Sequence, residues 1–149
     1  MTYPSPVQTF HRDTYAAINP TRPELSAKGK RIVVTGGGYG IGREIVNAFA
    51  QAGASTIAIM GRNEKPLQET KKIVEEAFPT TKVEVYIADV TNPEPVEKAA
   101  QSFGQWDVLI LNAGYLPGKA VVTGNGQANL KEWWKGFEVC DLLIFPDCG

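Results

Sequence analysis

The sequence predicts an α/β fold built on a doubly wound parallel sheet, and two observations carry this prediction. Four short stretches of strand length, three of them apolar runs and the third alternating apolar with polar residues, are separated by three stretches of helical periodicity between Arg31 and Leu111. A glycine-rich turn, Thr35 to Gly42, follows the first of these runs. Strands that alternate with helices pair in parallel through right-handed crossovers, which gives the strand order 3-2-1-4. This is the first half of a doubly wound sheet.

Composition allows one domain and excludes several classes of function. The 149 residues, 43% of them hydrophobic, suffice for a single core. A net charge of −1 offers no basic surface to nucleic acid or anionic lipid, and no apolar run reaches transmembrane length. The N-terminus lacks an apolar signal segment, and the two cysteines form no framework. We therefore expect a cytoplasmic protein with no metal site and no membrane or nucleic-acid partner.

The first 29 residues are expected to form an extended arm, because prolines such as Pro20 and Pro23 stand among polar residues without periodicity. His11, the only histidine, has no cysteine or second histidine nearby, so we assign it no metal or catalytic role. The binding domain is expected over residues 30–139, and residues 140–149 are expected to form a separate tail.

The first unit combines a strand over residues 31–34, the turn TGGGYGIG and a helix over residues 43–52. Gly36 can take a positive φ in a tight turn, Gly40 can let a pyrophosphate approach the backbone, and Gly42 can let the helix lie close to the strand. The helix N-terminus then offers free N–H groups and a partial positive charge. These features predict a dinucleotide ligand and a Rossmann-like sheet; the alternative is a tight turn with no ligand.

The second and third units continue the alternation after Gly53, which is expected to end the first helix. The apolar run 56–60 predicts a strand covered on both faces. Residues 64–78 predict an amphipathic surface helix that Pro79 stops. Residues 83–89 alternate apolar with polar side chains, which is typical of an edge strand.

The fourth unit begins with Thr91 and Glu94, which predict a capping box for a helix that ends before Gly104. The apolar run 108–111 then predicts a buried strand. In the order 3-2-1-4 this strand has a neighbour on one side only, and an open apolar edge promotes association.

Four motifs in this order resemble the short-chain dehydrogenase/reductase family over about residues 28–139: T-G-x-x-x-G-I-G, Gly61-Arg62, Asp89-Val90 and Asn112-Ala113-Gly114. Each follows an expected strand, at the sheet edge where open α/β sheets bind ligands. The resemblance implies hydride transfer between a nicotinamide and a carbonyl or alcohol carbon. The candidate cofactor-binding residues are Gly36, Gly38, Tyr39, Gly40, Ile41, Gly42, Arg62, Asp89, Val90, Asn112, Ala113 and Gly114.

The resemblance implies a role for each later motif, and each role has an alternative. Asp89 would accept a hydrogen bond from the adenine amino group while the Val90 backbone holds the ring; alternatively, Asp89 caps the next helix. The segment Asn112–Gly114 would pack against the adenosine side and steady the central strands; alternatively, it is a plain glycine turn.

Arg62 decides the expected cofactor. NAD sites place a carboxylate near the end of the second strand to bind the ribose hydroxyl, whereas an arginine there accommodates a 2′-phosphate. No carboxylate occurs from Ala58 to Gly61, and Arg62 follows at once. We therefore expect NADP(H) in preference to NAD(H), the alternative being a solvated arginine.

The family's catalytic pattern, a Tyr-x-x-x-Lys pair on one helix with a serine, has no convincing match. Tyr115 and Lys119 have the spacing, but Leu116-Pro117-Gly118 between them would break a helix. Tyr39 and Arg43 share the spacing inside the glycine turn. We assign no catalytic residue.

The segment Asn129–Val139 resembles the start of the family's long fourth helix, but Cys140 stands where the catalytic asparagine is expected. Two accounts remain: a truncated or mis-spliced product of a longer reductase, or a genuine short protein that binds a nucleotide or a partner without catalysis. We expect marginal stability and self-association through the open sheet edge and the face formed by Trp133, Trp134 and Phe137.

Overall fold

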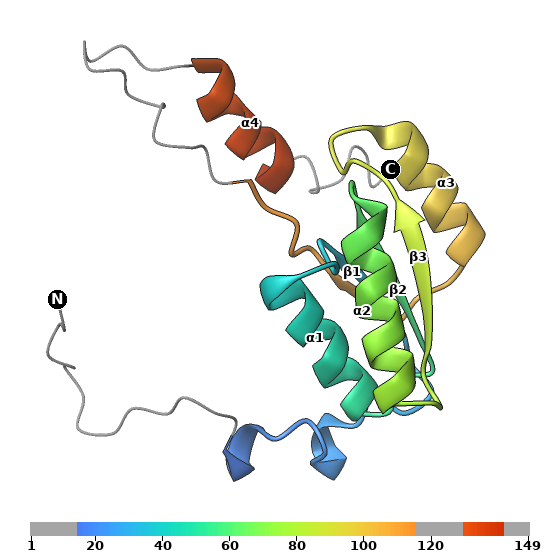
Figure 1. Cartoon of the computed structure of the whole chain (residues 1–149). Coiled ribbons are helices and arrows are strands. Elements are labelled where there is room, and N and C mark those ends of the chain that lie inside the picture. Colours follow the sequence, from blue (N-terminus) through green and yellow to red (C-terminus); the bar gives the residue numbers. More distant parts are fainter. Residues whose placement is uncertain (1–14, 116–129, 142–149) are drawn as a thin grey trace, which may run out of the picture.

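The computed structural model describes residues 15–115 and 130–141. Its parallel sheet has the predicted order β3-β2-β1-β4 (Figure 1). The elements in chain order are η1 (Ala16–Ile18), η2 (Pro23–Leu25), β1 (Arg31–Thr35), α1 (Gly40–Gln51), β2 (Thr56–Gly61), α2 (Glu64–Ala77), β3 (Lys82–Ile87), α3 (Pro93–Phe103), β4 (Val108–Ile110) and α4 (Leu130–Asp141). The first half of a doubly wound α/β sheet, predicted from the alternation of strands and helices, is confirmed.

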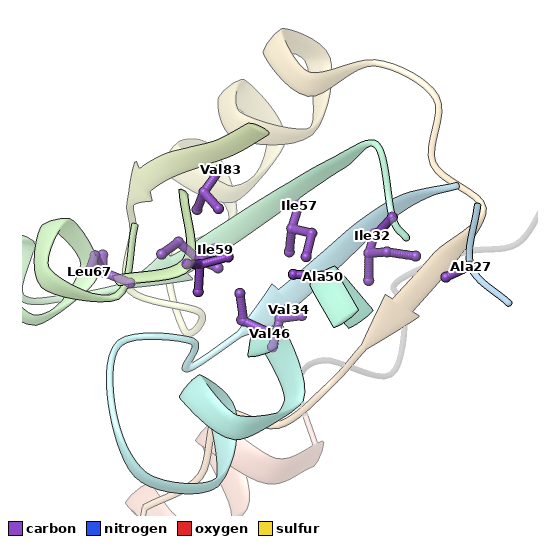
Figure 2. Packing of buried hydrophobic residues seen from close by; sticks show 11 residues of the cluster. Ala27, Ile32, Val34, Val46, Ala50, Ile57, Ile59, Leu67 and Val83 are labelled. Carbon is purple, nitrogen blue, oxygen red and sulfur yellow. The ribbon is translucent and has the colours of Figure 1, made fainter. Parts of the chain in front are cut away.

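Both faces of the central strands are covered, which explains their continuous apolar runs. Ile32 and Val34 of β1 are fully buried in the core cluster beneath α1 and α2 (Figure 2). Val33, between them, points to the other face and packs in a cluster with Phe103 of α3. Successive strand side chains point to opposite faces, so only an apolar residue at every position suits a strand with helices on both sides.

The start of α3 differs from the predicted capping box. Asn92 is the N-cap, and its side chain accepts the N–H of Glu94 at 3.3 Å. Thr91 turns instead toward Asp89, donating its N–H and its hydroxyl to Oδ1 at 3.0 and 2.8 Å. The capping box is wrong because Asn92, one residue later, supplies the side-chain acceptor for the first turn, and the Thr91 N–H that Glu94 would accept in a capping box donates to Asp89 instead.

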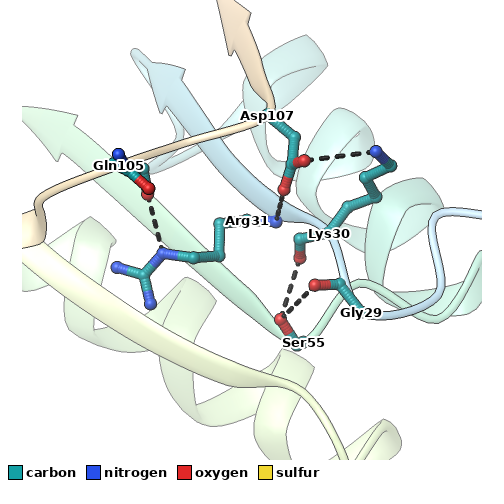
Figure 3. Close-up of polar contacts among 6 residues, drawn as sticks. All are labelled: Gly29, Lys30, Arg31, Ser55, Gln105 and Asp107. Atoms are coloured by element: carbon teal, nitrogen blue, oxygen red, sulfur yellow. Dashed lines mark hydrogen bonds and ion pairs between the residues drawn. The ribbon is translucent and has the colours of Figure 1, made fainter.

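A polar network at the N-terminal ends of the strands fixes β4 beside β1 (Figure 3). The carboxylate of Asp107 accepts the Arg31 N–H at 2.8 Å and the Lys30 Nζ at 3.1 Å. The Nε of Arg31 donates to the Gln105 carbonyl at 2.8 Å, and its guanidinium lies 4.2 Å from the ring centroid of Phe103. These bonds hold the α3–β4 connection, and the N–H of Arg31 with the Lys30 ammonium lowers the pKa of Asp107.

The two edges of the sheet are protected to different degrees. At the β3 edge, the Glu75 carboxylate of α2 accepts the Val83 N–H at 2.8 Å, so a side chain covers one edge donor. Within the described residues, β4 pairs with β1 and has no strand on its other side. Backbone groups at an uncovered edge can pair with another chain, and among residues 15–115 and 130–141 no strand covers the outer edge of β4.

The predicted N-terminal arm is partly folded where the structure describes it. Ala27 is buried, and its N–H donates to the Ala52 carbonyl at 2.9 Å. The Ser55 hydroxyl donates to the carbonyls of Gly29 and Lys30 at 3.0 Å (Figure 3). The end of the arm thus packs against the α1–β2 connection, while His11 lies outside the described residues.

Candidate nucleotide-binding site

A cavity of about 300 Å³ opens at the C-terminal edge of the sheet, where the glycine turn meets the ends of β2, β3 and β4. All twelve residues predicted to bind the cofactor line it: Gly36, Gly38, Tyr39, Gly40, Ile41, Gly42, Arg62, Asp89, Val90, Asn112, Ala113 and Gly114. The cavity is also lined by Gly61, Asn63, Pro66, Leu67, Ala88 and Val139. Parallel pairing brings these separate segments together, because the strands that carry them end at the same edge.

Steric constraints differ among Gly36, Gly40 and Gly42, three of the five glycines of the turn. Gly36 has φ +70°, and Gly40 has φ +56° with open space where a Cβ would stand. A Cβ on Gly42 would lie only 2.1 Å from the Gly36 carbonyl oxygen and 2.7 Å from Asn112 Nδ2. Gly42 therefore lets the first turn of α1 press against the end of β1, while Gly40 leaves its backbone open to the cavity.

Asn112 joins the end of β4 to the glycine turn. Its Nδ2 donates to the carbonyls of Thr35 and Gly36 at 3.0 and 3.3 Å. The N–H groups of Asn112 and Ala113 both donate to Thr35 Oγ1, at 3.1 and 3.0 Å. The segment Asn112–Gly114 thus makes specific contacts with the central strand, which a plain glycine turn does not require.

Asp89 contributes a fixed negative charge to the cavity wall. Bonds from the N–H and hydroxyl of Thr91, together with the positive field of Arg62, lower its pKa against the opposing effect of burial. Both donors bond Oδ1, and no described residue donates to Oδ2. At neutral pH the residue is a carboxylate with a free acceptor oxygen, suited to a neutral N–H donor.

Arg62, directly after β2, lines the cavity with an exposed side chain. Its guanidinium makes no hydrogen bond or ion pair with residues 15–115 or 130–141. Arg43, in the same region, donates through Nε and Nη2 to Gly38, Glu69 and Thr70. The five donors of Arg62 therefore remain available to an anion such as a phosphate.

The catalytic pattern considered in the sequence falls largely outside the described residues, since Lys119 and the three residues before it are not described. In the parts that are described, no group of three or more acidic, histidine or cysteine side chains could hold a metal ion. The described helices also include none with the length and apolarity to cross a bilayer.

Six lining residues lie outside the predicted set, and three of them, Asn63, Leu67 and Val139, show how far a sequence signal reaches. Asn63 directly follows Arg62 and is the N-cap of α2, so the motif at Arg62 is a sequence signal for its place in the cavity. For Leu67 the helical periodicity indicates only that it belongs to the apolar stripe of α2. Val139 lies on α4, and its approach to the glycine turn had no local signal.

The strand order, with a glycine turn between β1 and α1, defines a doubly wound, Rossmann-like α/β protein. The family model for short chain dehydrogenases matches residues 30–140. The chain therefore belongs to the short-chain dehydrogenase/reductase family.

Individual relatives agree with this assignment. The chain is 41% identical over 137 residues to the short chain dehydrogenase pigC of Monascus ruber, covering 85% of this chain and 43% of pigC. L-sorbose reductase from Gluconobacter frateurii, complexed with NADPH and L-sorbose, matches with 32% identity and a TM-score of 0.61 over 75% of this chain and 43% of that one.

A 3-oxoacyl-[acyl-carrier protein] reductase from Brucella melitensis with bound NAD shares the fold, with a TM-score of 0.71 at 24% identity over 88% of this chain and 49% of that one. The chain thus spans less than half the length of each of these three proteins.

Proposed function

We propose that this chain binds NADP(H), as the cofactor-binding part of a short-chain dehydrogenase/reductase-type oxidoreductase. The observation that carries the proposal is the single cavity lined by all twelve predicted residues, which come from four separate strand ends. When bound, the nicotinamide cofactor supplies or accepts the hydride exchanged with a carbonyl or alcohol carbon. The described residues bind and orient that cofactor.

Three regions of the cavity wall differ in chemistry, and each suits a different part of the cofactor. The open backbone at Gly40 and the N-terminus of α1 suit the pyrophosphate, because free N–H groups and the helix dipole favour anions. The free oxygen of Asp89 and the adjacent Val90 suit the adenine amino group and ring. The guanidinium of Arg62, which bonds no described residue, suits a 2′-phosphate.

The preference for NADP(H) over NAD(H) depends on Arg62. A charge-assisted hydrogen bond contributes about 1.5–3 kcal/mol, which corresponds to roughly 10- to 150-fold in affinity. The residues before it, Ile59, Met60 and Gly61, offer no carboxylate for a ribose hydroxyl. Arg62 makes no ion pair with a described residue that the phosphate would have to replace.

A second function, binding of a nucleotide without catalysis, is favoured by one observation. No described helix carries a Tyr-x-x-x-Lys pair: Tyr39 precedes α1, whereas Arg43 is engaged by Gly38, Glu69 and Thr70. We propose that the 149 residues bind the cofactor through a binding domain at residues 30–139. We also propose that they do not catalyse hydride transfer.

Calorimetric titration with NADPH and NADH tests the proposed function. We expect NADPH to bind at least tenfold more tightly, and Arg62→Ala to remove most of this preference. Lys72→Ala is the matched control, because it removes one positive charge from a side chain that is 75% exposed on the outer face of α2. Equal affinities for the two cofactors, or an equal loss of preference in the control, would overturn the assignment of Arg62.

A further inference from the structure

The carbonyl oxygen of Gly38, in the glycine turn, is held from outside the turn by two helices. Thr70 Oγ1 of α2 donates to it at 2.8 Å, and Arg43 Nη2 of α1 donates at 2.9 Å. The two side chains are also bonded to each other, since Arg43 Nε donates to Thr70 Oγ1 at 3.0 Å. Glu69 Oε2 accepts from Arg43 Nη2, the nitrogen that also bonds the Gly38 carbonyl, at 3.2 Å. We call the pair of residues that share this carbonyl the Arg43–Thr70 clamp.

Burial makes the geometry of the clamp well defined. Thr70 is completely buried, and the Arg43 side chain is only 21% exposed. Thr70 lies on the apolar stripe of α2 with Leu67 and Val74, where a hydroxyl without a partner would be costly. The Thr70 hydroxyl bonds the Gly38 carbonyl and Arg43, so it has a specific hydrogen-bonding role at a position where packing alone would favour valine.

The clamp determines where the next N–H points. The described chain has no cis peptide bond, and in a trans peptide the carbonyl and the following N–H point in opposite directions. Since the Gly38 carbonyl is directed at Arg43 and Thr70, the Tyr39 N–H is directed away from them. That N–H has no hydrogen-bond partner among the described residues, and both Gly38 and Tyr39 line the cavity.

We propose that Arg43 and Thr70 are positioning residues, which fix the Gly38–Tyr39 peptide so that the Tyr39 N–H is a preset donor to a phosphate oxygen of the dinucleotide. The inference rests on the proposed function, because it assigns a part of the same cavity. A donor that is already oriented loses little conformational freedom when the ligand binds, so the clamp raises affinity without touching the ligand.

Two substitutions of Thr70 separate this role from packing. Thr70→Val keeps the shape and removes the hydroxyl, whereas Thr70→Ser keeps the hydroxyl and removes a methyl group. We expect Thr70→Val to weaken NADPH binding about tenfold and Thr70→Ser to stay within about twofold of the unchanged chain. The Tyr39 amide resonance should shift in Thr70→Val alone. An equal effect of both substitutions, or none from valine, overturns the clamp.

A second variant and a second ligand keep the test decisive if Thr70→Val is unstable. Arg43→Lys retains the charge but lacks the planar guanidinium, whose Nε and Nη2 donate to Thr70 and to the Gly38 carbonyl in one fixed geometry. NADPH binding should therefore weaken, while adenosine, which has no phosphate, binds as before. Glu76→Gln, on the exposed face of α2, is the control that should change neither ligand. Equal weakening of both ligands by Arg43→Lys overturns the clamp.

The outcomes distinguish this inference from the proposed function. If the unchanged chain binds no NADPH, the proposed function fails and the clamp's role fails with it. If the unchanged chain binds NADPH and Thr70→Val and Arg43→Lys bind it equally well, the clamp alone is overturned.

Discussion

Replacing Gly42 by alanine tests how closely α1 approaches the end of β1. The new Cβ would lie 2.1 Å from the Gly36 carbonyl oxygen and 2.7 Å from Asn112 Nδ2. The oxygen belongs to the backbone, and the amide is bonded to Thr35 and Gly36, so neither can turn aside freely. Relief requires the helix and the turn to separate by roughly 1.4 Å, since the contact starts at 2.1 Å and non-bonded atoms pack at about 3.5 Å.

Two opposing effects set the magnitude. Alanine in place of glycine inside a helix normally stabilises by up to about 1 kcal/mol. Overpacking costs about 1–3 kcal/mol, and a weakened Asn112 bond adds about 1 kcal/mol. The steric term is the larger one, so we expect Gly42→Ala to lower the free energy of unfolding by about 2 kcal/mol.

Urea unfolding followed by circular dichroism measures this loss. Gly61→Ala is the matched control, because its Cβ would meet only Leu67 side-chain atoms, at an ordinary distance of 3.5 Å or more. We expect the control to stay within about 0.5 kcal/mol of the unchanged chain. A Gly42→Ala chain as stable as the control, or more stable, would refute the close approach of α1.

Three other predictions follow from the described contacts. Bonds from Thr91 lower the pKa of Asp89, so the Asp89 carboxylate contributes stability above about pH 4, and this contribution is lost as the pH falls through the pKa of the folded chain. Asp89→Asn still accepts from Thr91 but does not titrate, so in urea titrations it should lose less stability than the unchanged chain between neutral and acidic pH. Identical losses in the two chains would contradict this. Purified chain with NADPH and a panel of aldehydes and ketones should show no change in NADPH absorbance, and turnover that Tyr115→Phe abolishes would show that this tyrosine is catalytic. Light scattering after size-exclusion chromatography should show self-association of the chain. This association should weaken in Leu111→Lys, which places a charge beside the open β4 edge, or in Trp134→Ala, which removes a side chain that is 56% exposed on α4. A monomer at all concentrations would disprove the predicted self-association.

The alternation of strands and helices was readable from the sequence because each signal was local. Ile32 to Val34 are apolar at every position, which occurs only when helices cover both faces of a strand. The motifs at Gly36, Arg62 and Asn112 follow apolar runs, and Asp89 ends the alternating stretch of the third strand. Parallel pairing alone then brings them to one edge of the sheet.

The details that were missed depend on competition or on distant contacts. The spacing of Thr91 and Glu94 is typical of a helix cap, but Asn92 accepts the Glu94 N–H, and Thr91 donates to Asp89 instead. Thr70 looked like part of an apolar stripe, yet its hydroxyl bonds a carbonyl that is 32 positions away in the chain. The approach of Val139 to the cavity similarly depends on a contact far along the chain. Periodicity reports which face of an element is buried, and it does not report which polar atom meets another.

The most direct test of the account maps where NADPH binds on the chain. In amide NMR spectra of the labelled chain, NADPH should shift resonances of the glycine turn from Gly36 to Gly42, together with those of Arg62, Asp89 and the segment Asn112–Gly114. Resonances near Asp107, at the opposite end of the sheet, should stay unchanged. Shifts confined to other surfaces, or none at saturating NADPH, would contradict a dinucleotide site at this edge.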